Sequence, residues 1–179
     1  MWHPRLKGDE DQLESVQRRA TKLIPDLKHL EYTERLSRLN LPTLFYRRAR
    51  GDMIECYKYL TGIYNVAGEL LPRDQESTTR GHTYKLKKPS VKTSLRQNFF
   101  SVRVVNAWNS LPEGVVAAPS LNSFKNRLDR AWAHYKYTMD SKWYKAPKSN
   151  QTGTDETCEN NQEEVTRDDS SRSADRLVA

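Results

Sequence analysis

The stretch FFSVRVVNAWNSLP, residues 99–112, decides what kind of fold this sequence can form. Its apolar residues recur at helical spacing. One face collects four large side chains, Phe100, Val104, Trp108 and Leu111. Such a face needs a partner surface to bury it. We therefore predict a core-packed helix, with Asn98 or Ser101 as its N-cap and Pro112 as its end.

Four other segments carry the periodicity or the end signals of helices. They are residues 10–24, 32–39, 42–61 and 120–137. The predicted buried stripe of the first consists of Leu13, Val16, Ala20, Leu23 and Ile24. That of the third consists of Phe45, Ala49, Met53, Cys56 and Leu60. That of the last consists of Leu121, Phe124, Leu128 and Trp132, after Ser120 as the N-cap.

The segment before the helix of residues 99–112 is basic, and its residues do not recur at helical spacing. No Asp or Glu occurs between Ser77 and Pro112. Residues 82–96 alternate loosely and include Thr, Tyr and Val, which favours a short β-hairpin with its turn at residues 88–90.

These segments together predict a mainly α fold, a small helical domain of about five helices with a short β-hairpin. We divide it into a basic helical block (1–70), a polar loop and basic hairpin (71–98), and C-terminal helices of the same domain (99–145). Residues 146–179 are rich in Asn, Gln, Ser, Thr and acids and have few apolar residues, so we predict a disordered acidic tail.

Charge is distributed unevenly along the chain. The whole chain carries +7, while residues 149–179 hold eight acids and three arginines, a net of −5. The preceding 148 residues therefore carry +12. A body this basic favours polyanionic partners, of which nucleic acid is the commonest.

The two cysteines and the lack of long apolar runs indicate the cellular location of the protein. Cys56 and Cys158 are far apart and form neither a disulfide framework nor a zinc pattern, as expected of a reduced intracellular protein, nuclear or cytoplasmic. The N-terminus has no apolar run, so we expect no signal peptide. No segment approaches the roughly 18 apolar residues of a membrane span, so we expect no membrane association.

Catalytic and cofactor motifs are missing from the sequence. His3, His29, His82 and His134 are scattered without ligand spacing, and we expect them at the surface or at its edge. There is no GxSxG, Walker, HExxH or Gly-rich phosphate motif. Metal-assisted phosphoryl transfer needs carboxylates held by rigid strands or turns, and the adjacent aspartates Asp168 and Asp169 lie in the tail without a strand to hold them. We predict no enzyme activity, no cofactor, no metal and no small-molecule substrate.

The basic residues remain as candidates for contact with nucleic acid. The first group consists of Lys85, Lys87, Lys88, Lys92, Arg96 and Arg103, with Tyr84 or Phe99 to stack on bases. A second basic ridge consists of Arg18, Arg19 and Lys22. The alternative interpretation is a solvated positive face beside a core helix, and for the second ridge an ordinary helix surface.

Two long blocks resemble a known family. LESVQRRATKLIPDLKHLEYTERLSRLNLPTLFYRRARGDMIECYKYL, residues 13–60, resembles the segment after the polymerase domain of jockey-like non-LTR (LINE-type) retrotransposon reverse transcriptases. FFSVRVVNAWNSLPEGVVAAPSLNSFKNRLDRAW, residues 99–132, resembles the end of the same polyprotein. WHPRLKGDEDQLE resembles the stretch just upstream. The resemblance covers about residues 2–135 and does not extend to the acidic tail.

The resemblance implies a helical region beyond the polymerase, whose basic face lies along RNA or an RNA–DNA hybrid. It implies no catalytic residue, because the aromatic-Ala-Asp-Asp motif, the endonuclease domain and the Cys/His knuckle of related elements are missing from the chain. A family label of RNA-directed DNA polymerase would therefore not describe this chain. Two alternatives stay open, a degenerate retroelement remnant and a host-reused protein-interaction module without nucleic-acid binding.

Overall fold

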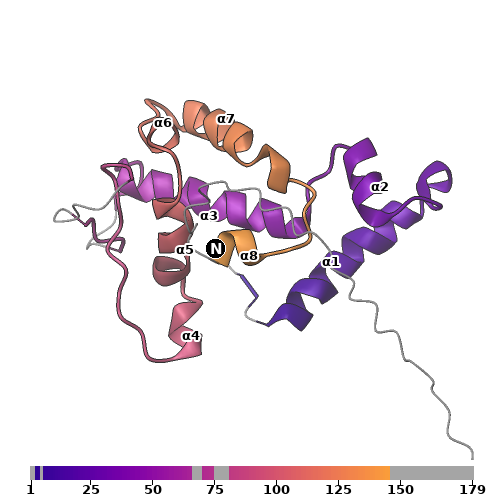
Figure 1. The fold of residues 1–179 in the computed structure, drawn as a ribbon, viewed down its shortest axis with the longest axis horizontal. Helices are drawn as coiled ribbons and strands as arrows, with labels where there is room; N and C mark the ends of the chain where they lie inside the picture. The colour runs from indigo at the N-terminus through magenta and orange to yellow at the C-terminus, as the bar shows by residue number, and fades with distance from the viewer. Residues whose placement is uncertain (1–2, 5, 66–69, 75–80, 146–179) are drawn as a thin grey trace, which may run out of the picture. The chain divides into compact units, whose positions relative to one another are not determined.

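The computed structural model of the 179-residue chain describes residues 3–4, 6–65, 70–74 and 81–145 (Figure 1). These residues form eight α-helices, two short 3-10 helices and no β-strand, so the mainly α fold class is confirmed. The α-helices are α1 (Lys7–Lys22), α2 (Tyr32–Arg38), α3 (Leu44–Leu60), α4 (Ser94–Gln97), α5 (Phe100–Asn109), α6 (Glu113–Val116), α7 (Leu121–Ala131) and α8 (Lys142–Lys145). Residues Met1–Ser149 form one compact unit. The predicted disordered tail, 146–179, lies outside the described residues.

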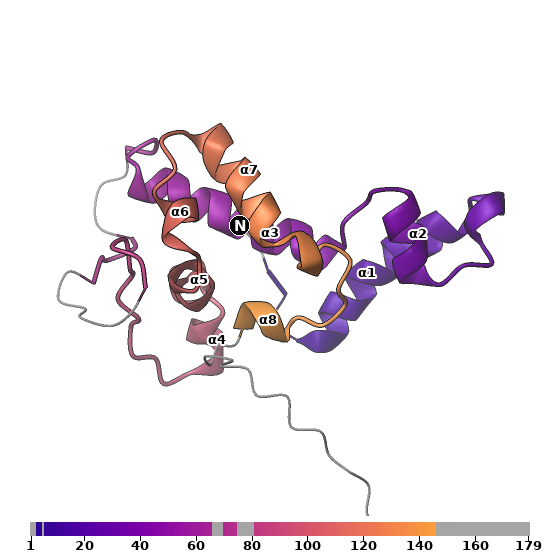
Figure 2. The same cartoon turned by 45° about the horizontal axis from the view of Figure 1, so that its top comes forward.

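Helix α3 forms the centre of the core. It begins after Thr43, whose hydroxyl accepts a hydrogen bond from the Tyr46 amide at 3.1 Å. Four residues of its predicted stripe, Phe45, Ala49, Met53 and Cys56, are buried, and the fifth, Leu60, is partly buried. Helices α5 and α7 pack against α3 from two sides, as both views show (Figures 1 and 2).

Helix α5 provides the largest fully buried side chain, Trp108. Its ring lies against His82 and Phe124, and its indole N–H donates to the Tyr84 carbonyl at 2.8 Å. The predicted face of this helix is therefore confirmed. Its predicted cap is wrong, because the N-cap is Phe99 and no side chain caps the helix.

Helix α7 begins at the predicted N-cap, where the Ser120 hydroxyl accepts from the Ser123 amide at 3.2 Å. Its buried residues Phe124 and Leu128 match the predicted stripe. The helix ends at Ala131, earlier than predicted, and a 3-10 helix (Ala133–Tyr135) follows. The predicted helix thus continues in a tighter form.

The predicted apolar stripe of α1 is wrong. Val16 and Leu23 are exposed, Leu23 at 83%, and the buried side chains of α1 are Glu10, Glu14 and Thr21. The reason is that polar contacts dock this helix. The Glu14 carboxylate accepts the Leu44 amide at 3.0 Å and the Tyr32 hydroxyl at 2.6 Å. A capping contact at the start of α3 therefore outweighs burial of the apolar side.

The predicted hairpin is also wrong. Between residues 81 and 93 the one residue in a β-bridge is Leu86, and its partner is Arg73 rather than a residue beyond the expected turn. The Asn109 carboxamide accepts from the Leu86 amide and donates to its carbonyl, both at 2.9 Å. A side chain of α5 thus satisfies the backbone that a second strand would have paired.

Truncating Trp108 should destabilise the core, because it removes the largest fully buried side chain among the described residues. We expect Trp108→Ala to lower the free energy of unfolding by about 3–5 kcal/mol, because a large cavity forms where α5, α7 and residues 82–84 meet. Leu23→Ala is the control, because truncating this exposed side chain should change the free energy of unfolding by less than about 0.5 kcal/mol. Urea unfolding measures both. Equal effects of the two changes would contradict this core.

Candidate nucleic-acid interface

Residues 81–98, which we call the basic strap, lead from the core surface into α5. Two contacts with α5 fix the course of the strap. The buried His82 ring contacts the Trp108 carbonyl through Nε2 at 3.0 Å, and Leu86 is held by Asn109. Because His82 is buried, its expected position at the surface is wrong. The strap has little regular structure before α4, yet side-chain and backbone hydrogen bonds hold it in place.

Four of the predicted contact residues lie exposed on this strap. They are Lys87, Lys88, Lys92 and Arg96. None of the four forms an ion pair with any residue in the described part of the chain. The structure therefore places four cationic side chains on one segment at the surface.

Lys85 differs from these four residues. It is 9% exposed, and its side chain lies over Gly81. A Cβ atom on residue 81 would stand 2.6 Å from Lys85 Cε, and the φ of +135° at Gly81 is one that residues with a side chain rarely adopt. The side chain of Lys85 is packed along the strap rather than presented to solvent.

Arg103 is also withdrawn from the surface. Its guanidinium makes a two-point contact with the fully buried Asp52 carboxylate, Nε to Oδ2 at 3.0 Å and a terminal nitrogen to Oδ1 at 2.8 Å. The Tyr144 hydroxyl donates to the same carboxylate at 2.9 Å. Desolvation and the nearby Asp52 charge raise the pKa of the Tyr144 phenol well above its ordinary value. The charge of Arg103 therefore compensates an internal carboxylate.

The second basic ridge is not brought to the strap. Arg18, Arg19 and Lys22 are exposed on α1, and the Arg18 guanidinium lies 5.1 Å from the centre of the Tyr32 ring. In both views α1 lies well apart from α4 (Figures 1 and 2). The two predicted groups are thus separate surfaces.

One exposed aromatic ring lies within the strap and another directly after it. Tyr84 is 38% exposed and Phe99 is 46% exposed. The guanidinium of Arg73 lies 5.7 Å from the Tyr84 ring centre, and that of Arg96 lies 5.0 Å from the Phe99 ring centre. Aromatic rings beside cations are the arrangement on which bases of single strands stack.

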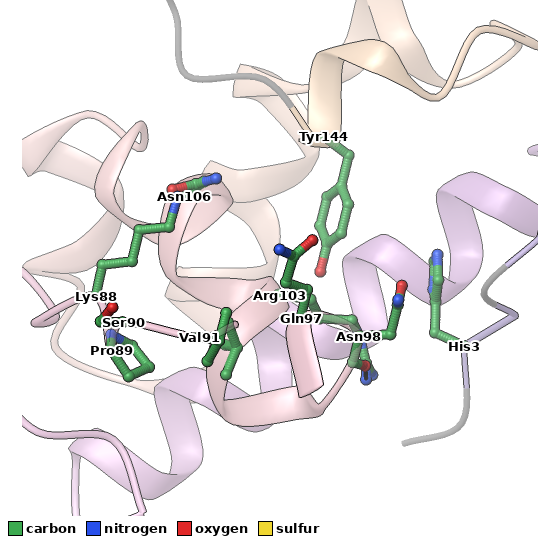
Figure 3. A pocket seen from close by; sticks show the side chains of 11 residues that line it. His3, Lys88, Pro89, Ser90, Val91, Gln97, Asn98, Arg103, Asn106 and Tyr144 are labelled. Carbon is green, nitrogen blue, oxygen red and sulfur yellow. Dashed lines mark hydrogen bonds between the residues drawn. The ribbon is translucent and has the colours of Figure 1, made fainter. Parts of the chain in front are cut away.

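A pocket of about 650 Å³ lies beneath the strap, and sequence reasoning missed it. Its lining comes from the strap, from α5, from Tyr144 of α8 and from His3 near the N-terminus (Figure 3). Residues so distant in sequence give no local pattern. The buried Asp52 behind it did leave a signal, because an acid inside the apolar stripe of 42–61 needs an internal partner.

The described ranges hold no candidate metal centre. No cluster of three His, Cys, Asp or Glu side chains suited to a metal ion occurs among these residues. Asp168 and Asp169 lie outside them. Within the described residues, no helix combines the length and the apolar character that crossing a membrane requires.

Comparisons with protein-family models, with curated proteins and with solved structures found no match.

The internal ion pair can be tested by a mutant cycle. We expect Arg103→Met to destabilise the fold by about 3–5 kcal/mol, because it leaves the buried Asp52 charge without its cation. Adding Asp52→Leu should restore part of that loss, since an apolar pair replaces the ion pair. Urea unfolding of both single variants and the double variant measures the coupling. Simple additivity would contradict the pairing.

The buried thiol gives a prediction about cysteine reactivity. Burial, with a further contribution from Asp52, raises the pKa of Cys56 well above its ordinary value. Since the thiolate is the reactive form, a raised pKa keeps Cys56 protonated at pH 8. In a Cys158→Ser variant, a disulfide reagent should therefore modify Cys56 slowly in buffer and rapidly in urea. Equal rates in the two conditions would contradict the burial.

Proposed function

We propose that this chain is a non-catalytic module that contacts nucleic acid, from the region that follows the polymerase domain of a retrotransposon-derived reverse transcriptase. Its partner is RNA or an RNA–DNA hybrid, and its place of action is intracellular, in the nucleus or the cytoplasm. The resemblance of residues 13–60 and 99–132 to that region supports the origin. It supplies no catalytic residue, and the proposal includes none.

The observation that carries the proposal is the uncompensated charge of the basic strap. Lys87, Lys88, Lys92 and Arg96 are exposed, and residues 81–112 contain no acid. Glu113, the next acid along the chain, accepts from the Thr83 amide and hydroxyl at 3.0 and 3.1 Å. Cations that form no ion pair within the described residues attract phosphates and release counterions on binding.

Arg103 and Lys85 are left out of the interface. The first is bound to Asp52 and the second is packed over Gly81. The interface we propose therefore consists of the four exposed cations with Phe99 and Tyr84 as stacking surfaces. Arg18, Arg19 and Lys22 form at most a second, separate contact.

A second candidate is a protein-interaction module without nucleic-acid binding. It is supported by the exposed apolar side chains of α1 and its flanks, Leu6, Val16, Leu23 and Ile24. A retroelement remnant that has lost its partner surface would show the same exposure. Salt-dependent RNA binding separates the first proposal from both.

The test replaces three strap lysines in the full-length chain. We expect Lys87→Gln, Lys88→Gln and Lys92→Gln together to weaken binding to a labelled RNA–DNA hybrid. The slope of log affinity against log salt should fall in magnitude by about 2 to 3, since each lost phosphate contact contributes about 0.7–0.9. Fluorescence anisotropy at several salt concentrations measures the slope.

The matched control removes three exposed cations elsewhere, by Lys28→Gln, Arg38→Gln and Arg130→Gln. The change in net charge is the same, so a general field effect would weaken both variants equally. Circular dichroism confirms that both remain folded. If the strap variant keeps the affinity and slope of the control, the strap is not the interface.

A further inference from the structure

The pocket beneath the basic strap is lined by cationic, amide and apolar side chains, and the proposed function assigns no ligand to it. Figure 3 shows Lys88 and Pro89 on one side, His3 on the other, and Tyr144 and Arg103 between them. Its volume of about 650 Å³ lies within the range of about 300–1,000 Å³ that holds small organic ligands. It is therefore large enough for more than a water molecule or a simple ion.

The charge of the pocket wall selects the sign of the ligand. No Asp or Glu occurs among its lining residues, which all belong to the described chain. Two internal carboxylates lie behind the lining, that of Asp52, which is bound by Arg103 and Tyr144, and that of Glu10, 3.8 Å from His3 Nε2. Lys88 forms no ion pair with the described residues and adds a positive charge at the strap side. The wall therefore suits an anion and does not suit a metal cation.

The amide groups of the pocket suit a ligand with both donors and acceptors. Gln97, Asn98 and Asn106 all line it. The Asn98 side chain is used within the fold, where its amide donates to the Ser94 carbonyl at 2.7 Å. The Gln97 carboxamide is exposed and makes no hydrogen bond with the described residues. A carboxamide can donate and accept at once, which is how Gln and Asn recognise the edges of bases.

The pocket also has apolar surfaces. Pro89 and Val91 come from the strap, and Val102 comes from α5. A flat ring with apolar faces, a polar edge and an attached anion can satisfy all three kinds of wall at once. A nucleobase with its phosphate is such a group.

We propose that this pocket receives one unstacked nucleotide, with its base toward Gln97 and its phosphate toward Lys88. The inference rests on the proposed function and adds a preference for single strands, because a base paired within a duplex cannot enter the pocket. The nucleotide can belong to a single strand or be a free mononucleotide. The two sources share one chemistry and are separated by the test.

The experiment uses the full-length chain and a change that leaves charge unaltered. Gln97→Leu removes the amide from an exposed position in the short helix α4, and Gln12→Leu on α1 is the matched control. We expect Gln97→Leu to weaken binding of a single-stranded oligoribonucleotide by about five- to tenfold, through lost hydrogen bonds to the base. Binding of a blunt RNA–DNA hybrid, and its salt slope, should not change. Gln12→Leu should alter neither.

A second measurement tests the pocket without a strand. Adenosine monophosphate, added at millimolar concentration, should shift the NMR signal of the Gln97 side-chain amide, and inorganic phosphate alone should shift it less. A shift with the mononucleotide but no Gln97 effect on the oligonucleotide would overturn the strand as source and leave the free nucleotide as the ligand.

The failures of the two proposals are distinguishable. If the strap lysines govern hybrid binding while Gln97→Leu leaves single-strand affinity unchanged and adenosine monophosphate shifts nothing, the pocket proposal is overturned and the proposed function stands. If no nucleic acid binds, the function fails, and the mononucleotide titration alone decides the pocket. An equal shift of Gln97 by a polyglutamate peptide would assign the pocket to acidic peptides and overturn the nucleotide.

Discussion

The buried carboxylate of Asp52 is the constraint on which much of the structure depends. It lies in the middle of α3 with no exposure to solvent, so its charge must be met from inside the protein. Arg103 of α5 and Tyr144 of α8 meet it. These two contacts orient both helices against α3, and they place Arg103 and Tyr144 in the wall of the pocket. One internal acid thus links the core to the candidate site.

Anchors on α5 explain how a segment without strands can form an ordered surface. Trp108 and Asn109 are adjacent on this helix, and both bind the backbone of the strap, at Tyr84 and at Leu86. The residues that follow Leu86 then run along the outside of the core, where their lysines face solvent. The aromatic helix and the basic segment before it are therefore linked, because α5 holds the strap in position.

Helices with a long apolar stripe could be predicted from the sequence, because their packing follows the local pattern. This is true of α3, α5 and α7. The face of α1 could not be predicted, since Glu14 docks it through contacts with Tyr32 and Leu44 that the pattern does not contain. The hairpin failed for a related reason, because its partner is the distant side chain of Asn109. The pairing of Arg103 with Asp52 could not be predicted either, since a count of cations does not separate paired from exposed charges.

Several acids of the helices are paired with cations of the helices, so they do not neutralise the exposed cations of the strap. In the helices, Asp129 binds Arg50 at 2.6 Å and Glu55 binds Lys58 at 2.8 Å, so these acids are occupied locally. Glu14 accepts neutral donors and also neutralises no lysine of the strap. Glu113 holds Thr83 at the start of the strap, and the four exposed cations form no ion pair within the described residues. Under the proposed function, their attraction depends on phosphate rather than on base sequence. Under the same proposal, selectivity comes from a different element, the amide-lined pocket, whose lining includes both Lys88 of the strap and Gln97.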